Sequence, residues 1–245
     1  MRMTRTLIVV LMVLCGAGVA GADFKVVQAT HQDGFSMMGQ NQPAKDEERT
    51  TWIGDKRMRM DQGDTSTIVL LNANKMFILN HDQKSYYEID LPIDLAAMLP
   101  PGMGDQMMQM MKFDVTITPS DETKEVNGWA AKRYDMQMKS AMLTMDSVLW
   151  ASTETPIDAS DYVSLYGEVM SLQPGTADMI AKMRQIEGFV VAQETSMTMS
   201  MMGDSKVRTN ETTTAIEEAE APAGTYGPPE GYTKSDLDYM KMMQR

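Results

Sequence analysis

Cysteine is almost absent from this sequence: 245 residues contain a single one, Cys15, and it lies within the first 22 residues. The rest of the chain therefore cannot form a disulfide, a thiolate metal site or a cysteine nucleophile. Histidine occurs only twice, and the G-x-S-x-G, H-E-x-x-H and P-loop patterns are missing. We therefore expect no enzyme activity, no catalytic residues and no cofactor, and our main interpretation includes no metal site.

The N-terminal residues have the three parts of a secretory signal. Two arginines precede an apolar run at 7–14 that is too short to span a bilayer, and Ala20-Gly21-Ala22 forms a small-residue cleavage site. Cleavage before Asp23 predicts a periplasmic protein. Cys15 follows Leu14 rather than a small residue, which argues against a lipid anchor but leaves lipidation as an alternative.

Basic residues are scarce beyond the leader, where 20 of them face 34 acidic residues, a balance of −14. Nucleic acids and anionic membrane surfaces are therefore disfavoured as partners. No later segment is long and apolar enough to predict a transmembrane span. Aromatic residues make up 7% of the chain, whereas methionine occurs 28 times, so any functional hypothesis has to account for the methionines.

Short alternating segments separated by turn residues predict a chain of many strands. The expected strands cover residues 24–31, 48–53, 56–61, 67–71, 76–79, 85–89, 112–118, 124–126, 130–138, 142–150, 188–201 and 206–216. His81, between Asn80 and Asp82, is interpreted as a turn residue. The expected fold class is mainly β (α+β): a curled antiparallel sheet that forms an incomplete barrel covered by short helices.

Residues 91–111 interrupt this pattern with several prolines and glycines, and we interpret them as a loop-helix insertion across one end of the sheet. Two further segments, 159–172 and 176–183, are expected to be helical. We find no internal repeat or domain linker. The expected organisation is a signal peptide at 1–22, a single half-barrel domain at 23–235 and a C-terminal tail at 236–245.

Methionine recurs at every second position in three of the expected strands. Residues two apart in a strand share a face, and the intervening residues are polar, which is typical of a sheet with one buried and one solvated face. We expect these methionines on the same concave side and name them as candidate ligand-binding residues: Met58, Met60, Met136, Met138, Met197, Met199 and Met201. Four methionines of the insertion would form a cover: Met107, Met108, Met110 and Met111.

Three interpretations of the methionines stay open. They can fill an ordinary core, which makes the protein a structural component of the envelope. They can line an adaptable cavity for a lipid or acyl chain, since a flexible, polarizable side chain accepts varied apolar shapes. They can also bind Cu(I) or buffer oxidants, because thioethers are soft ligands. We favour a non-catalytic periplasmic protein that binds a hydrophobic small molecule or lipid; the protein partner stays unknown.

Several short motifs resemble an exported family of uncharacterised function. The segments are T-W-I-G-D-K-R-M-R-M-D from Thr51, K-M-F-I-L from Lys75, N-G-W-A-A-K-R-Y from Asn127 and P-E-G-Y from Pro229. Together they are similar to the family called domain of unknown function 4412. That resemblance implies a fold like the periplasmic lipoprotein carriers (LolA-like), with helices on the concave side of an incomplete barrel around an apolar cavity. It implies no functional residues.

Overall fold

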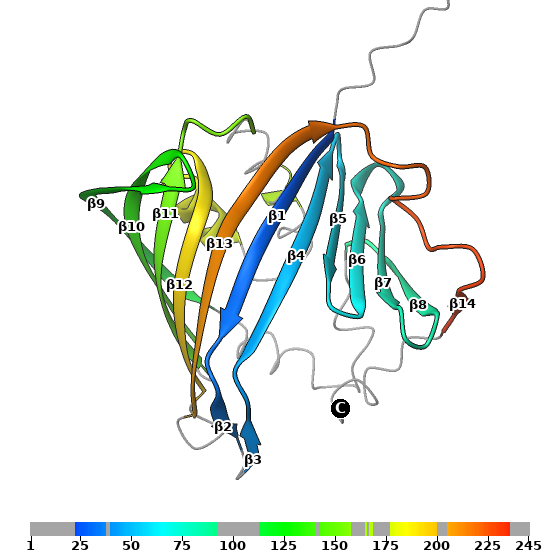
Figure 1. Ribbon diagram of the computed structural model, residues 1–245, viewed down its shortest axis with the longest axis horizontal. Coiled ribbons are helices and arrows are strands. Elements are labelled where there is room, and N and C mark those ends of the chain that lie inside the picture. The colour runs from blue at the N-terminus through cyan, green and yellow to red at the C-terminus, as the bar shows by residue number, and fades with distance from the viewer. Residues whose placement is uncertain are drawn as a thin grey trace, which may run out of the picture.

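One twelve-stranded sheet organises the part of the chain that the structure describes (Figure 1). The structure is a computed structural model in which residues 23–37, 40–92, 113–140, 143–157, 165, 167–168, 177–199 and 205–235 are described. The strand order is β14-β8-β7-β6-β5-β4-β1-β13-β12-β11-β10-β9. Neighbours pair antiparallel except β14 and β8, which pair parallel. The edge strands β14 and β9 do not meet, so this strongly curved sheet is open rather than a closed barrel.

The strands and helices have the following bounds. The sheet contains β1 (Asp23–Gln32), β4 (Lys45–Gly54), β5 (Arg57–Gln62), β6 (Thr65–Leu70), β7 (Lys75–Asn80), β8 (Ser85–Asp90), β9 (Asp114–Val126), β10 (Trp129–Lys139), β11 (Leu143–Ser152), β12 (Phe189–Met199), β13 (Ser205–Ala219) and β14 (Thr233–Lys234). A separate two-stranded sheet pairs β2 (Phe35–Met37) with β3 (Gln40–Gln42). The helical elements are η1 (Leu71–Ala73) and α4 (Ala177–Met183).

The strand register divides the side chains between two faces. We call the face that carries Val26, Met58 and Tyr134 the inner face and the opposite one the outer face. Buried residues of the inner face form two hydrophobic clusters, one that includes Val26 and Ile53 and another around Tyr134. The predicted mainly β fold is confirmed by this sheet. The prediction was possible because strands with alternating apolar and polar residues need one buried face for the apolar ones.

Strand β9 is continuous where the sequence predicted two strands with a turn between them. Pro119 and the polar residues after it resemble a turn, but β9 is an edge strand and its proline needs no hydrogen bond on the free side. The ladder to β10 shifts register here: Thr123 pairs with Lys132, whereas Pro119 pairs with Tyr134. Three residues of β9 thus bulge opposite one residue of β10, so that the strand absorbs the turn-like segment.

An irregular C-terminal segment, residues 220–232, lies on the outer face of the β5–β8 half of the sheet and leads into β14 (Figure 1). Ile68, Leu79 and Ser66 on this face are fully buried. Arg59 donates a hydrogen bond to the Thr225 carbonyl over 2.9 Å. The C-terminal segment therefore covers part of the outer face of this half, where these side chains are buried.

The same segment is also held near the start of β1. Asp23, which is buried, accepts hydrogen bonds from Arg57 at 3.0 and 3.2 Å. The guanidinium carbon of Arg57 stands 4.4 Å from the centre of the Tyr226 ring, a cation–π contact. Burial raises the pKa of the Tyr226 hydroxyl, and the neighbouring Asp23 carboxylate raises it further. The Tyr226 hydroxyl therefore stays protonated to a higher pH than the hydroxyl of a free tyrosine.

The expected cover of short helices is not borne out. In the described part of the chain, α4 is packed against β9, which matches the expected helix at 176–183. Of the expected helix at 159–172, only residues 165 and 167–168 are described, and these are helical. Most of the insertion at 91–111 lies outside the described residues, as do the signal peptide and the tail. The outer face of the β5–β8 half is covered by irregular backbone instead. Among the described residues, no helix combines the length and the apolar character that crossing a membrane requires.

A buried polar chain attaches the C-terminal segment to the sheet. His81 Nδ1 lies 2.7 Å from the Tyr232 hydroxyl, and His81 Nε2 lies 2.6 Å from Ser66 Oγ. Ser66 in turn donates to Asp61, which also accepts from Arg59 Nε over 2.7 Å. His81 does sit in a turn, as its sequence context predicted, but its ring also connects two distant parts of the chain.

Replacing Tyr232 with Phe removes one end of this chain of hydrogen bonds and leaves a half-buried His81 nitrogen without its partner. We expect a loss of about 1–2 kcal/mol in the free energy of unfolding, measured by urea denaturation. Tyr87→Phe is the matched control, because the described residues provide no hydrogen bond to that hydroxyl. A Tyr232→Phe protein as stable as the control would show that the contact does not hold the segment.

Candidate functional site

Six of the seven predicted methionines lie in described strands, and all six project to the inner face. Met58 and Met60 lie on β5, Met136 and Met138 on β10, and Met197 and Met199 on β12. All six are half-buried. Their placement on one face of a single sheet is confirmed. Met201 and the four cover methionines, Met107, Met108, Met110 and Met111, lie outside the described residues.

The register shows which of these methionines are neighbours. Met138 stands directly opposite Met145 of β11, and Met145 stands directly opposite Met197 of β12. One step along the strands, Met199 pairs with Leu143 on one side of this row, and Met136 pairs with Ser147 on the other. Five methionines from three adjacent strands thus form one group. We call Met136, Met138, Met145, Met197 and Met199 the methionine patch.

A buried apolar cluster lies beside the methionine patch on the inner face. Tyr134 and Val115 are 1% exposed and Leu149 is 2% exposed, and they share a hydrophobic cluster with Met136 and Met138. The Tyr134 hydroxyl accepts a hydrogen bond from the backbone N–H of Glu187 over 3.1 Å, which satisfies the one polar atom of this ring. The inner face at this point therefore combines closely packed, buried side chains with the half-exposed, flexible methionines of the patch.

Helix α4 adds two thioethers beside the patch. Met179 and Met183, one helical turn apart on one face of α4, pack against the same cluster as Met136 and Met138. Lys182 of this helix donates to the Val115 carbonyl on the free edge of β9 and lies 3.6 Å from the Asp114 carboxylate. This contact blocks part of the unpaired edge and fixes α4 at the border of the methionine patch.

Met58 and Met60 do not belong to the methionine patch. Strands β4, β1 and β13 separate β5 from β12, and their inner faces carry polar side chains between the two groups. Arg49 forms an ion pair with Glu211 and donates to Gln28 Oε1 at 3.0 Å. Gln28 itself is buried and donates to Glu211 over 2.8 Å.

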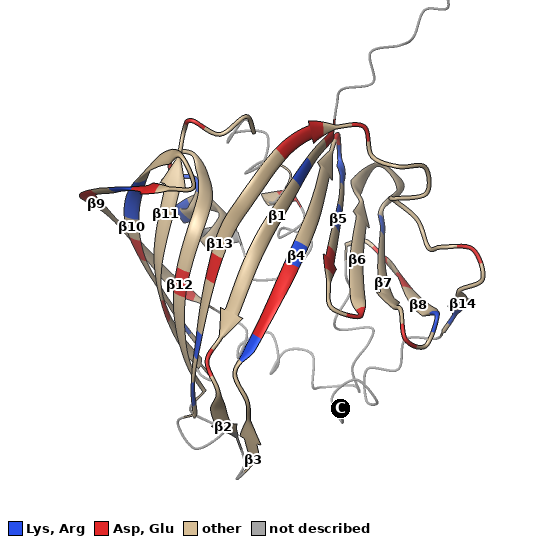
Figure 2. Cartoon of the chain, viewed as in Figure 1, with Lys and Arg blue, Asp and Glu red and all other residues tan. Residues whose placement is uncertain are grey.

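Figure 2 shows the charged run of β4 that contributes to this polar strip. A continuous apolar cavity across all the predicted methionines would have to cross the half-buried Arg49–Glu211 ion pair, and a charge removed from water needs its partner. The predicted single site is therefore two separate groups of methionines on one face.

Sequence reasoning missed Met145, the central residue of the patch. The signal was present, because Leu143, Met145, Ser147 and Leu149 alternate with residues of the opposite face. That strand holds only one methionine in this run, so a search for methionines at every second position passed over it. Met179 and Met183 were missed for a similar reason, since their four-residue spacing is helical rather than strand-like.

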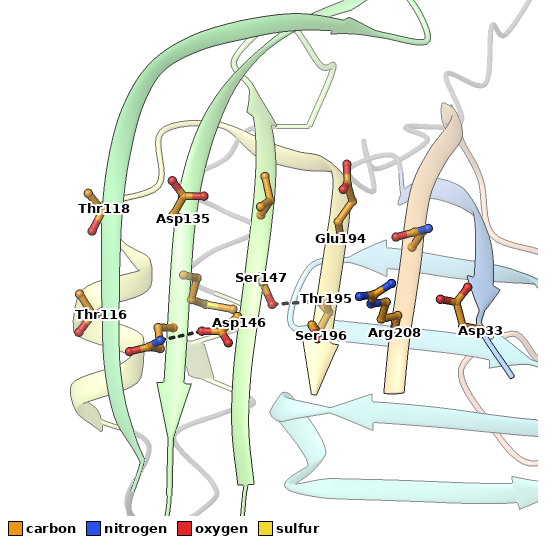
Figure 3. Close-up of a pocket in the computed structure, with 14 residues that line it drawn as sticks. Asp33, Thr116, Thr118, Asp135, Asp146, Ser147, Glu194, Thr195, Ser196 and Arg208 are labelled. Atoms are coloured by element: carbon orange, nitrogen blue, oxygen red, sulfur yellow. Dashed lines mark hydrogen bonds between the residues drawn. The ribbon is translucent and has the colours of Figure 1, made fainter. Parts of the chain in front are cut away.

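A hollow of about 790 Å³ lies over strands β9–β13 and has a different character (Figure 3). By register, most of its lining residues belong to the outer face, and Met136 is the one predicted methionine among them. Asp135, Asp146 and Glu194 make it acidic, with Arg208 as a basic residue in the lining. Gln137 donates to Asp146 over 2.7 Å, and Arg133 to Asp135 over 2.8 Å. Such a solvated, largely paired surface does not suit an apolar ligand.

Comparisons with known proteins add little. A scan against family models and a search of curated proteins each found no match, so the resemblance to the domain of unknown function 4412 family stays a prediction. A search of solved structures found a match described as "Structure of PNGF-II in C2 space group", with a TM-score of 0.39 and 10% sequence identity. The match covers 91% of this chain and 32% of that chain, and a similarity this remote carries no inference about function.

Proposed function

We propose that this chain is a non-catalytic binding protein of the bacterial periplasm, and that its methionine patch takes a hydrophobic ligand, a lipid or acyl chain. The observation that carries the proposal is the group of five half-buried thioethers on three adjacent strands, next to a buried apolar cluster. The periplasmic location rests on the leader sequence alone.

Side-chain chemistry supports an apolar ligand on this part of the inner face. Methionine has three rotatable bonds and a polarizable sulfur, so a surface of methionines can adapt to chains of different length and shape. Each CH₂ group removed from water contributes about 0.8 kcal/mol before the costs of binding are subtracted. The nearest polar pair on the inner face, Ser147 and Thr195, is internally satisfied at 2.9 Å, so it makes no demand on a bound chain.

The test is binding of a fluorescent fatty acid to the full mature chain and to Met136→Glu and Met199→Glu variants. A carboxylate at either position would have to be desolvated beneath the ligand at a cost of several kcal/mol, so we expect affinity to fall at least about tenfold. Thr116→Glu is the matched control, because Thr116 is exposed on the outer face of neighbouring β9. It should bind as the wild type does.

A second control separates the two methionine groups. Met60→Glu places the same charge on the inner face but beyond the polar strip of Arg49 and Glu211, so it should leave fatty-acid affinity within about twofold of wild type. Equal losses in Met60→Glu and Met136→Glu would contradict the assignment to the methionine patch. If the wild-type protein binds no acyl probe, the protein is no lipid binder and the structural interpretation of the methionines replaces this one.

A further inference from the structure

The centre of the methionine patch is a row of three thioethers at one level of the sheet. Met138, Met145 and Met197 come from β10, β11 and β12 and stand directly opposite one another. Directly opposed residues have Cβ atoms about 4.5–5.5 Å apart. Because each sulfur extends beyond Cβ on a flexible chain, the two outer sulfurs can lean toward the middle one. Buried Val115 and Val207 close the two ends of the row.

The side chains with oxygen atoms that hard metal ions prefer lie on the opposite, outer face of the same strands. Asp146, which follows Met145, and Gln137, which precedes Met138, point to the outer face, where they are bonded to each other. Oxygen ligands suit Mg²⁺ and Ca²⁺, whereas thioethers select soft ions such as Cu(I). The described residues also include no group of three or more His, Cys, Asp or Glu side chains arranged for a metal ion. The inner face at this level therefore offers sulfur without competing oxygen or nitrogen ligands.

We propose that Met138, Met145 and Met197 form a binding site for one soft monovalent metal ion, Cu(I) or Ag(I). Met145 is the central ligand, because it is adjacent to both of the others. Met136 and Met199 lie beside the row on β10 and β12, and Met179 and Met183 pack against the same cluster as Met138, so apolar side chains flank the site. This site goes beyond the acyl-chain proposal without depending on it.

The experiment uses Ag(I) as a redox-inert probe on the full mature chain with ¹³C-labelled methionine methyl groups, in chloride-free buffer. Substituting Met138, Met145 or Met197 with Leu, one at a time, assigns their methyl signals and preserves side-chain volume, so the fold should tolerate each change. In the wild type we expect these three signals to shift together and to be complete near one equivalent of Ag(I). Zn²⁺ should leave them unchanged.

Isothermal titration of the variants gives the second readout. We expect Met145→Leu to weaken the tightest Ag(I) site at least tenfold, whereas Met60→Leu, on the far side of the polar strip, keeps wild-type affinity. Fatty-acid binding to the metal-free wild-type protein tests the acyl-chain proposal separately, so that failure of one proposal can be told from failure of the other. Wild-type Ag(I) affinity in Met145→Leu, or first shifts at other methionines, would overturn the site.

Discussion

Replacing Tyr134 with Ala should lower the free energy of unfolding by about 3–5 kcal/mol, the cost typical of truncating a fully buried aromatic ring. Tyr134 is 1% exposed and has the largest fully buried side chain among the described residues. Its ring belongs to the cluster against which Met136 and Met138 pack. The truncation would leave a cavity there and would also leave the Glu187 amide without its acceptor. Urea denaturation measures the change.

Tyr134→Phe isolates the hydroxyl from the ring. It keeps the packing and removes only the hydrogen bond from Glu187, so about 1 kcal/mol should be lost. Fatty-acid binding measured on the folded Tyr134→Phe protein should stay close to wild type, because the hydroxyl faces the loop after α4 rather than the ligand. If Tyr134→Ala and Tyr134→Phe lower the free energy of unfolding equally, the Tyr134 ring does not stabilise the cluster beside the methionine patch.

Local alternation made most of the sheet predictable. Residues 57–60 alternate Arg and Met, and β5 places the two kinds of side chain on opposite faces, with Arg57 bonded to Asp23 and Arg59 to Asp61. The period of two depends only on the backbone pleat, so it can be recognised in the sequence of one strand without its neighbours. The continuity of β9 could not be predicted in this way, because Pro119 is tolerated only when that strand lies at the sheet edge.

The site was predictable in part for the same physical reason. Alternation assigns a face to each methionine, but it says nothing about which residue of the next strand stands opposite. The row of Met138, Met145 and Met197 is a product of register, which follows from turn lengths and bulges. The polar strip through Arg49 was equally hidden, since a charged residue in an alternating strand is normally assigned to the solvated face.

The methionine patch and the polar hollow are opposite faces of the same strands. Successive residues of β10, β11 and β12 therefore point in turn to the apolar surface and to the hydrated, acidic one. Met138 and Gln137 are an example. A one-residue slip in register would exchange the two surfaces. The end of β11 and the start of β12 approach closely at Gly188, next to a register shift between Trp150 and Ala151, and we expect this contact to hold the register.

Gly188→Ala should destabilise the protein by about 3 kcal/mol or more, because the added Cβ atom would clash with the backbone at this contact. Gly188 has a φ of +100°, a conformation that L side chains rarely adopt. A Cβ atom there would lie 2.4 Å from the Ser152 carbonyl oxygen and 2.5 Å from its carbon. Both are backbone atoms, and Ser152 pairs with Phe189 in the ladder. Strain at positive φ and steric overpacking therefore add together.

Gly224→Ala is the matched control for the backbone conformation. Its φ is +84°, but a Cβ atom there would meet nothing within 4 Å, so only the conformational cost of about 1 kcal/mol applies. Urea denaturation of the two variants gives the difference, which measures the close approach of β11 and β12. Met145 and Met197 lie toward the other ends of these strands, so folded Gly188→Ala protein should still bind the fatty-acid probe. Equal stability of the two variants would show that the β11–β12 junction yields to an added Cβ and does not hold the register.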